Sequence, residues 1–579
     1  MQIIFLISFL LLIEMSKQKI YWLLAIVSIL FAYFLGMLLD VMDVDTAQYA
    51  LISRDMLKTG NYLQVLERGH DYLDKPPLLF WVTSFFYAIF GVSQFVYRIA
   101  PFLSTLIGVY ATYRLTTLYY GKQAGNIAGL MLGACQAYFL TNHDVRTDTM
   151  LTNAIAYSLW QLAAFTEKKD FRFLFGAFVG MGIAMLAKGP IGIMVPVLAF
   201  ATHFILRREF KQFFRWEWLL GAVIVLLVLS PMMYGLYYQF DAQPEKITNG
   251  VKGESGLYFY FWKQSFGRLT GENVWKDDSD SFFFVHTFLW SFLPWQFLFL
   301  GGYIKGVYTI FKQKLFLSKT QEGLTLGGFT LPFIAMSMSH FKLPHYIYVV
   351  FPLAAMLTAG YVVFLIENVD KYKKLFRWHL GLQIFTQIIL VLLVSVLVFW
   401  SFAIQNFSLL LIGLLVLMIS FGLLFIRLDI FSKLLLPSAL TIAGVNILLN
   451  SQIYPALFPY QSGKAVAEFA KKNNISPQQI YTFVNGSDGA YHSHTLDFYS
   501  PATTAGKKDD INDFEKVYQK QKVFFIYTDS LGKKDLEKKY PNIKQYQRFN
   551  RYHITQLTPE FLNPNTRKST FCPIYLMKF

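Results

Sequence analysis

Three aspartates follow the first long apolar run of the sequence: Asp40, Asp43 and Asp45. For any one of them, the plain alternative is the solvated end of a membrane segment. Asp45, however, stands directly before a helix-like stretch at 46–58, where an aspartate caps a helix and its carboxylate is fixed in direction. A carboxylate fixed in an outward direction is what a general base requires. The sequence therefore predicts Asp45 as a candidate base.

A second polar segment, NHDVRTDTM at 142–150, places His143, Asp144, Arg146 and Asp148 between two apolar runs. Ionisable groups at membrane depth cost about 2.5–3.5 kcal/mol each on insertion scales unless they are paired or hydrated. Four of them together predict a polar cavity. The alternative is an arginine–aspartate pair that only closes a helical hairpin.

Cations occur in the same kind of position at Lys75, Lys188, Lys342 and Arg146. A single interfacial lysine often only extends its ammonium towards water. Four separate segments, however, bring these cations to one predicted face beside carboxylates. Such a cluster suits an anionic lipid head group, because charge-assisted contacts to phosphate are short and strong. No Gly-Lys-Ser/Thr phosphate loop, paired-cysteine metal site or Gly-x-Ser-x-Gly sequence offers a competing chemistry.

The composition indicates a membrane protein. Of the 579 residues, 55% are hydrophobic and only 15% are charged, and the mean hydropathy is positive. The formal charge of +16 lies mostly in short basic clusters between apolar runs, which is typical of loops that stay on the cytoplasmic side. The charge therefore describes membrane topology, and no nucleic-acid partner is expected.

The elements that must position these residues are apolar helices. We expect an all-α polytopic membrane protein with an N-terminal extension at 1–19 and a membrane domain at 20–454. About thirteen stretches approach the roughly 20 residues that a span requires. They lie at 20–39, 98–119, 124–142, 149–166, 171–188, 190–206, 217–238, 282–304, 323–339, 344–366, 378–400, 407–426 and 432–450.

The remaining segments are assigned to one side or the other by their charge. Basic stretches such as 167–172, 207–215 and 305–319 alternate with polar ones, so the first exterior loop (40–97) and a long exterior loop (239–281) should share the exported face. Within 40–97, the run at 76–90 is too short to cross. We expect it to be a juxtamembrane helix that starts at its two prolines.

The tail at 455–579 is rich in Lys, Asp, Asn and Gln. It contains an amphipathic stretch at 462–473 and strand-like runs at 480–484 and 522–528, which predict a small α/β domain outside the membrane on the exported side. The HSH sequence at 492–494 is a weak metal pattern that is expected to be structural.

The motifs occur in a familiar order: DVDTAQYALISRDMLKTGNYLQV, YLDKPPLLFW, FGVSQFVYRIAP, VRTDTML, LAKGPIGIMVP and SHFKLPHYIYVVFPLAAML. Over about residues 20–365, this set resembles the GT-C superfamily of membrane glycosyltransferases. The resemblance is to the ArnT-type lipid A aminoarabinose transferases and to the polyprenyl- or dolichyl-phosphate-mannose protein mannosyltransferases. It implies the GT-C fold and an inverting transfer of a sugar from a polyprenyl phosphate to a lipid of the lipid A type, a glycan or a protein. It also implies an active site on the periplasmic side of a bacterial cytoplasmic membrane.

The resemblance also implies roles for individual residues. Asp45 would be the catalytic carboxylate with Asp43 as its neighbour, and Asp148 would be the acidic residue of the second loop. The charge on the leaving phosphate would be stabilised first by Lys75, and then by Arg268, Lys342, Lys188 and Arg146. The expected substrate cavity further includes Asp74, Tyr49, Arg54, Tyr72, His340 and His345.

The sequence departs from the family pattern at Asp74, where glutamate is usual, and at Thr46 and Gln48, where an acidic residue and an arginine are common. The long loop also lacks the family's metal-binding histidine in 267–280. A divalent metal at Asp74, with Glu272, Asp277, Asp278 or Asp280, remains one alternative, and no other cofactor is expected. Two further alternatives are a transporter or flippase of lipid-linked sugars and an inactive membrane subunit.

Overall fold

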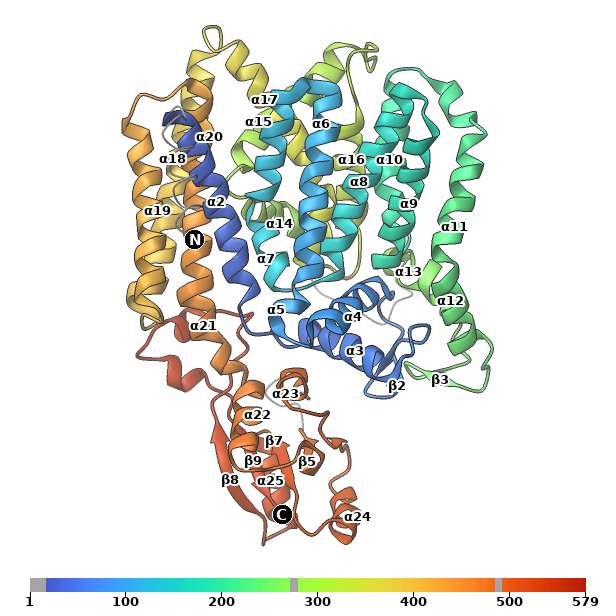
Figure 1. The fold of residues 1–579 in the computed structure, drawn as a ribbon, viewed down its shortest axis with the longest axis vertical. Helices are drawn as coiled ribbons and strands as arrows, with labels where there is room; N and C mark the ends of the chain where they lie inside the picture. Colours follow the sequence, from blue (N-terminus) through green and yellow to red (C-terminus); the bar gives the residue numbers. More distant parts are fainter. Residues whose placement is uncertain (1–16, 271–279, 485–491) are drawn as a thin grey trace, which may run out of the picture.

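The computed structural model describes residues 17–270, 280–484 and 492–579. Long helices stand side by side in a bundle, short helices lie across its lower end, and a small domain containing a β-sheet hangs below (Figure 1). The helices of the bundle are α2 (Lys17–Met37), α6 (Ile99–Gly133), α7 (Gln136–His143), α8 (Thr147–Lys168), α9 (Phe171–Lys188), α10 (Ile191–Leu206), α11 (Glu217–Leu236), α14 (Phe283–Ser291), α15 (Gln296–Lys312), α16 (Leu324–Ser337), α17 (Phe351–Glu367), α18 (Lys373–Val396), α19 (Phe407–Phe425) and α20 (Ile430–Leu448).

In the part of the chain that the structure describes, eight helical stretches are long and apolar enough to cross a membrane. They include α2, α9, α11, α18 and α19, and the helical runs built on α6, α17 and α20. The protein is therefore an integral multi-pass membrane protein, as the composition predicts. The total of about thirteen spans stays a prediction.

Two predicted helices are interrupted. The predicted span at 124–142 is divided between the C-terminal part of α6 and the helix α7. The break lies at Ala134 and Cys135. The predicted span at 282–304 is divided into α14 and α15 at Pro294, which has no backbone N–H to continue the helical ladder. α15 then runs on to Lys312, into a stretch that was predicted to be loop.

The first exterior loop folds into short elements at the lower end of the bundle (Figure 1). They are α3 (Asp45–Thr59), a hairpin of β1 (Leu66–Glu67) and β2 (His70–Asp71), α4 (Leu78–Phe90) and α5 (Gln94–Tyr97). α4 has 13 residues and reaches only about 20 Å, so it is too short to cross. Phe85, Ile89 and Phe90 are more than half exposed on it, as expected for a helix in contact with lipid.

The start of α3 differs from the prediction. Asp45 is the first residue of the helix, the N-cap position belongs to Val44, and no side chain caps the helix. The carboxylate of Asp45 is therefore free to turn away from the backbone of its own helix and to contact another segment.

The C-terminal domain is an α/β unit, as predicted. Its five-stranded sheet has the order β6-β5-β7-β9-β8, with β5 parallel to β6 and β7, and β9 antiparallel to β7 and β8. Successive residues of β7 face opposite sides, so that Tyr527 joins one apolar cluster with Val466 and Ile526 joins another with Phe514. The elements are α22 (Gly463–Lys472), β5 (Ile480–Phe483), α23 (His494–Tyr499), β6 (Gly506–Lys507), α24 (Asp513–Lys520), β7 (Phe525–Thr528), α25 (Ser530–Lys539), β8 (Lys544–Phe549) and β9 (Ile574–Lys578).

One buried arginine binds backbone carbonyl groups from two separate exterior segments. Arg98 is 0% exposed, and its guanidinium donates to the carbonyl oxygens of His143 (3.0 Å) and Asp40 (2.8 Å), and also to that of Leu39. These oxygens belong to the end of α7 and to the segment that follows α2. Arg98 therefore fixes the beginning of the first exterior loop against the second.

We expect Arg98→Leu to lower the stability of the protein by about 3 kcal/mol or more, because several buried carbonyl oxygens lose their donor at about 1–3 kcal/mol each. Thermal unfolding in detergent should show a clearly lower midpoint. Arg172→Leu is the matched control, because Arg172 is the second residue of α9 and its side chain is 90% exposed and pairs with Asp170, the N-cap of that helix. Equal midpoints for the two variants would contradict the role given to Arg98.

Candidate active site

Arg146 connects the two exterior segments that the sequence singles out. It lies in extended backbone directly before α8; its Nη1 contacts the carboxylate of Asp45, and its Nε lies 3.1 Å from Oδ2 of Asp144. Thr46 donates from Oγ1 to the other oxygen of Asp144. The start of α3 and the start of α8 are thus held together by one guanidinium between two carboxylates.

Arg146 and Asp144 shift each other's pKa. Burial opposes the charged form of Arg146, but the carboxylates of Asp144 and Asp45 raise its pKa. Burial likewise raises the pKa of Asp144, but Arg146 and the Thr46 hydroxyl outweigh it and hold the pKa below its usual value. The group is therefore a stable ionic network at neutral pH.

A second charged group lies around Asp148 in the first turn of α8. Its carboxylate pairs with Nζ of Lys188, at the end of α9, and lies 3.7 Å from Nε2 of His345. The ammonium of Lys188 also lies 3.7 Å from the ring centroid of Tyr346. Asp148 is only 2% exposed, so it anchors the lysine from inside the protein.

A third group comes from the LDKPP stretch. The ammonium of Lys75 contacts the carboxylate of Asp74, which also accepts a hydrogen bond of 3.4 Å from Gln264. The Asp74 side chain is 41% exposed, whereas that of Lys75 is 14% exposed. Lys342 donates to the backbone oxygen of Asp280 at 3.1 Å.

Two buried tyrosines lie between these groups. Burial raises the pKa of Tyr49; Asp45, Asp74 and Asp148 raise it further, and Arg146 lowers it. Charges from all three groups therefore act on one hydroxyl. Burial also raises the pKa of Tyr72, and its hydroxyl has no hydrogen-bond partner within the described residues.

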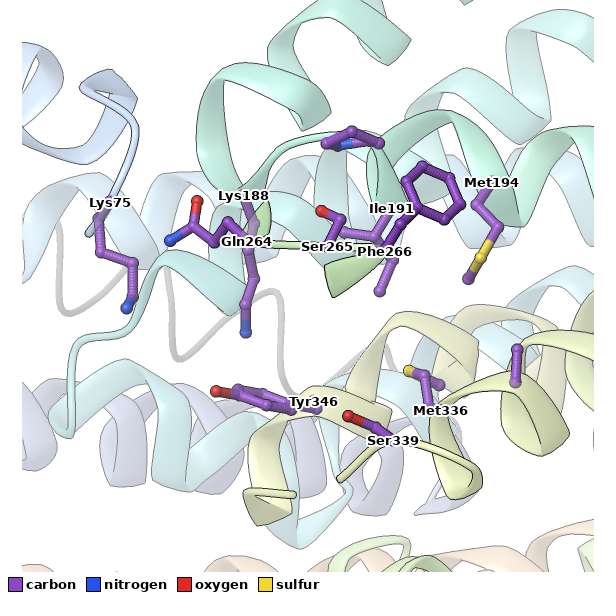
Figure 2. A pocket seen from close by; sticks show the side chains of 12 residues that line it. Lys75, Lys188, Ile191, Met194, Gln264, Ser265, Phe266, Met336, Ser339 and Tyr346 are labelled. Atoms are coloured by element: carbon purple, nitrogen blue, oxygen red, sulfur yellow. The ribbon is translucent and has the colours of Figure 1, made fainter. Parts of the chain in front are cut away.

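A cavity of about 120 Å³ adjoins the second and third groups. In Figure 2, Lys75, Lys188 and Gln264 lie towards one end, and Met194 and Phe266 lie towards the other. The full lining is Lys75, Lys188, Pro190, Ile191, Met194, Gln264, Ser265, Phe266, Ala335, Met336, Ser339 and Tyr346. The cavity is therefore cationic at one end and apolar at the other.

Several predicted residues lie elsewhere. Asp43 accepts hydrogen bonds from the C-terminal domain, and Arg54 donates to Asp497 O and to Thr503 Oγ1 in that domain, so neither faces the cavity. Arg54 was predicted to lie in the substrate cavity; it does not line this one, and its guanidinium is buried against these domain groups. His340 is exposed in an irregular stretch.

Other predicted residues are described only in part or lie outside the described residues. For Arg268 the structure places only the backbone, in α13 (Gly267–Thr270). Glu272, Asp277 and Asp278 lie outside the described residues. Conversely, no sequence pattern indicated Gln264, and Tyr346 was indicated only by its neighbour His345.

The described residues contain no set of side chains that matches the predicted metal site. No three His, Cys, Asp or Glu side chains lie together there in a way that could hold a metal ion. Asp74 is paired with an ammonium, which competes with a metal for the same carboxylate oxygen. A metal at Asp74 stays a prediction, because Glu272, Asp277 and Asp278, which were predicted as its partners, lie outside the described residues.

Comparisons with known proteins agree on one fold. The family model described as dolichyl-phosphate-mannose-protein mannosyltransferase matches residues 74–234. A crystal structure of apo ArnT from Cupriavidus metallidurans matches with a TM-score of 0.74 and 17% identity, covering 97% of this chain and 98% of that one. The same protein bound to undecaprenyl phosphate matches with a TM-score of 0.73, 17% identity and the same coverage.

Among curated sequences, an undecaprenyl phosphate-α-4-amino-4-deoxy-L-arabinose arabinosyl transferase of Proteus mirabilis is 26% identical over 363 residues, or 61% of each chain. The chain spans only 55–64% of the length of the first curated relatives that it matches. The family model, these relatives and the shared fold agree with the motif order. The chain thus shares the fold of ArnT, and part of it is similar in sequence to these arabinosyl transferases.

Proposed function

We propose that this protein transfers a sugar from a polyprenyl-phosphate donor to a lipid acceptor of the lipid A type. The observation that carries the proposal is the cavity that presents two lysines at one end and apolar side chains at the other. Asp148, which pairs with one of these lysines, lies two residues after Arg146, the partner of Asp45. The arabinosyl transferase of Proteus mirabilis and the ArnT complex with undecaprenyl phosphate support the choice of donor.

The cavity suits the two parts of such a donor. A phosphate needs preorganised cations, and Lys75 and Lys188 line the cavity with their side chains largely buried. A polyprenyl chain needs an apolar surface that is open to the membrane, which Ile191, Met194 and Met336 supply. The carboxylates of Asp74 and Asp148 hold the two ammonium groups in position.

The reaction follows from this placement. The acceptor oxygen forms a bond to the anomeric carbon while the bond from that carbon to the donor phosphate breaks. The electron pair leaves with the phosphate, where Lys75 and Lys188 stabilise the growing charge. Asp45, held by Arg146, orients the acceptor and takes its proton if the acceptor is a hydroxyl. If the acceptor is itself a phosphate, Asp45 only orients it.

We also propose that the cavity and the C-terminal domain face the periplasm and that the protein lies in the bacterial inner membrane. Basic segments such as 207–215 and 370–377 lie between helices at the opposite end of the bundle from this domain. The positive-inside rule then favours a cytoplasmic location for that end.

Lys75→Ala should lower transfer from a purified polyprenyl-phosphate sugar by about 100-fold or more, since one preorganised donor contributes that much to a charged transition state. The protein should still insert and show an unchanged unfolding midpoint. Lys211→Ala is the control, because Lys211 is exposed in the basic segment at the far end of the bundle. Near-full transfer by Lys75→Ala would remove this lysine from the site.

Met194→Trp should fill the apolar end of the cavity and raise the KM for a long-chain donor about tenfold, the scale of an overpacked apolar site. A donor with a short prenyl chain should be affected much less. Val197→Trp on the same helix is the matched control, because Val197 is 52% exposed outside the cavity. The same KM change for both chain lengths would contradict this assignment of the cavity.

A further inference from the structure

The segment between α2 and α3 is held from outside the membrane domain. The N–H of Val41 donates to the hydroxyl of Tyr499 (2.8 Å), and the N–H of Asp43 donates to Oε1 of Gln461 (2.7 Å). The Asp40 carboxylate accepts two bonds of 2.8 Å from Nζ of Lys464, in α22. This stretch leads directly to Asp45, so its conformation sets where α3 begins.

Asp43 is the strongest of these contacts. One oxygen accepts from the N–H of Thr495 (2.9 Å), and the other accepts from the hydroxyls of Thr495 (2.8 Å) and Ser493 (2.9 Å). All three donors lie at the start of α23. Both oxygens of the Asp43 carboxylate therefore accept hydrogen bonds from the C-terminal domain, whereas the family resemblance implied a catalytic neighbour of Asp45.

The same domain also holds the body of α3. Nε2 of His494 lies 2.8 Å from one oxygen of Glu67, whose other oxygen accepts from Gln48 at 2.8 Å. Arg54, two turns further along α3, donates to the backbone oxygen of Asp497 at 2.9 Å. α3 is therefore held through its preceding segment and at two further points along its length.

We propose that the C-terminal domain positions the Asp45 segment for transfer, with Asp43 as the principal positioning residue. The inference rests on the proposed function. The Asp45 side chain is 40% exposed and is paired with Arg146, so neighbouring contacts must fix its backbone. A reacting group displaced by 1 Å can lose about 100-fold in rate. The domain is then part of the catalytic unit, although it contributes no group to the reaction.

The test compares three variants of the full-length protein in detergent with a purified polyprenyl-phosphate sugar. Asp43→Ala removes every acceptor of the contact and should lower kcat about 100-fold, with little change in the KM for the donor. Asp43→Asn keeps an acceptor oxygen for Thr495 and should retain kcat within a fewfold of the wild type. A catalytic carboxylate would not tolerate this change, so equal loss in both variants would overturn the proposal.

The third variant, Ser493→Ala with Thr495→Ala, leaves the membrane domain untouched and should lower kcat at least tenfold. Its matched control is Thr555→Ala with Ser569→Ala, at exposed positions of the same domain. Wild-type kcat in the Ser493/Thr495 variant would overturn the proposal. This variant also covers the case in which Asp43→Ala does not fold.

A second readout is independent of transfer. In hydrogen–deuterium exchange, amides of the segment from Asp40 to Tyr49 should exchange faster in Asp43→Ala and in the Ser493/Thr495 variant, with the strands of the C-terminal domain unchanged. Unchanged exchange in that segment would overturn the positioning role. A wild-type protein without transfer activity would instead overturn the proposed function, so the two failures are distinguishable.

Discussion

The structure depends on one guanidinium between two loops. Arg146 pairs with Asp45 at the start of α3 and with Asp144 before α8, and thereby joins the first exterior loop to the second. Partly buried carboxylates at this depth are costly without a counter-charge, so the arginine makes their joint position favourable. Arg98 supports the arrangement, because it donates hydrogen bonds to the carbonyl oxygens of Asp40 in the first segment and His143 in the second. The role proposed for Asp45 follows from this fixed placement.

Three parts of the protein then meet at the same place. The membrane helices supply a cavity that joins cations to an apolar surface, which matches a lipid that carries an anionic head group. The exterior loops supply the carboxylates that hold those cations. The C-terminal domain holds the segment that precedes Asp45 through its contacts with Asp43 and with the backbone of Val41. Three different parts of one chain therefore supply the binding cavity, the charged groups and the positioning contacts.

Local sequence patterns predicted much of this architecture. The length of the run at 76–90 and its two prolines indicated the short helix α4, and the strand-like runs at 480–484 and 522–528 indicated β5 and β7. The polar residues at 142–150 indicated a buried charged group. The patterns did not reveal the partners of Asp43, because those partners lie about 450 positions away and no local periodicity encodes such a pairing. For the same reason Arg54 was assigned to the cavity, and the break at Pro294 was missed inside an otherwise uniform apolar run.

The central claim is that this site breaks and forms a glycosidic bond and does not merely move a lipid. The direct measurement follows a donor labelled in its sugar, in sealed vesicles that contain the wild-type protein or Asp45→Asn, together with a lipid A-type acceptor. We expect the wild type to attach the label to the acceptor and to release free polyprenyl phosphate, and we expect Asp45→Asn to do neither. Movement of the intact donor across the vesicle membrane without transfer, or equal transfer by both proteins, would contradict it.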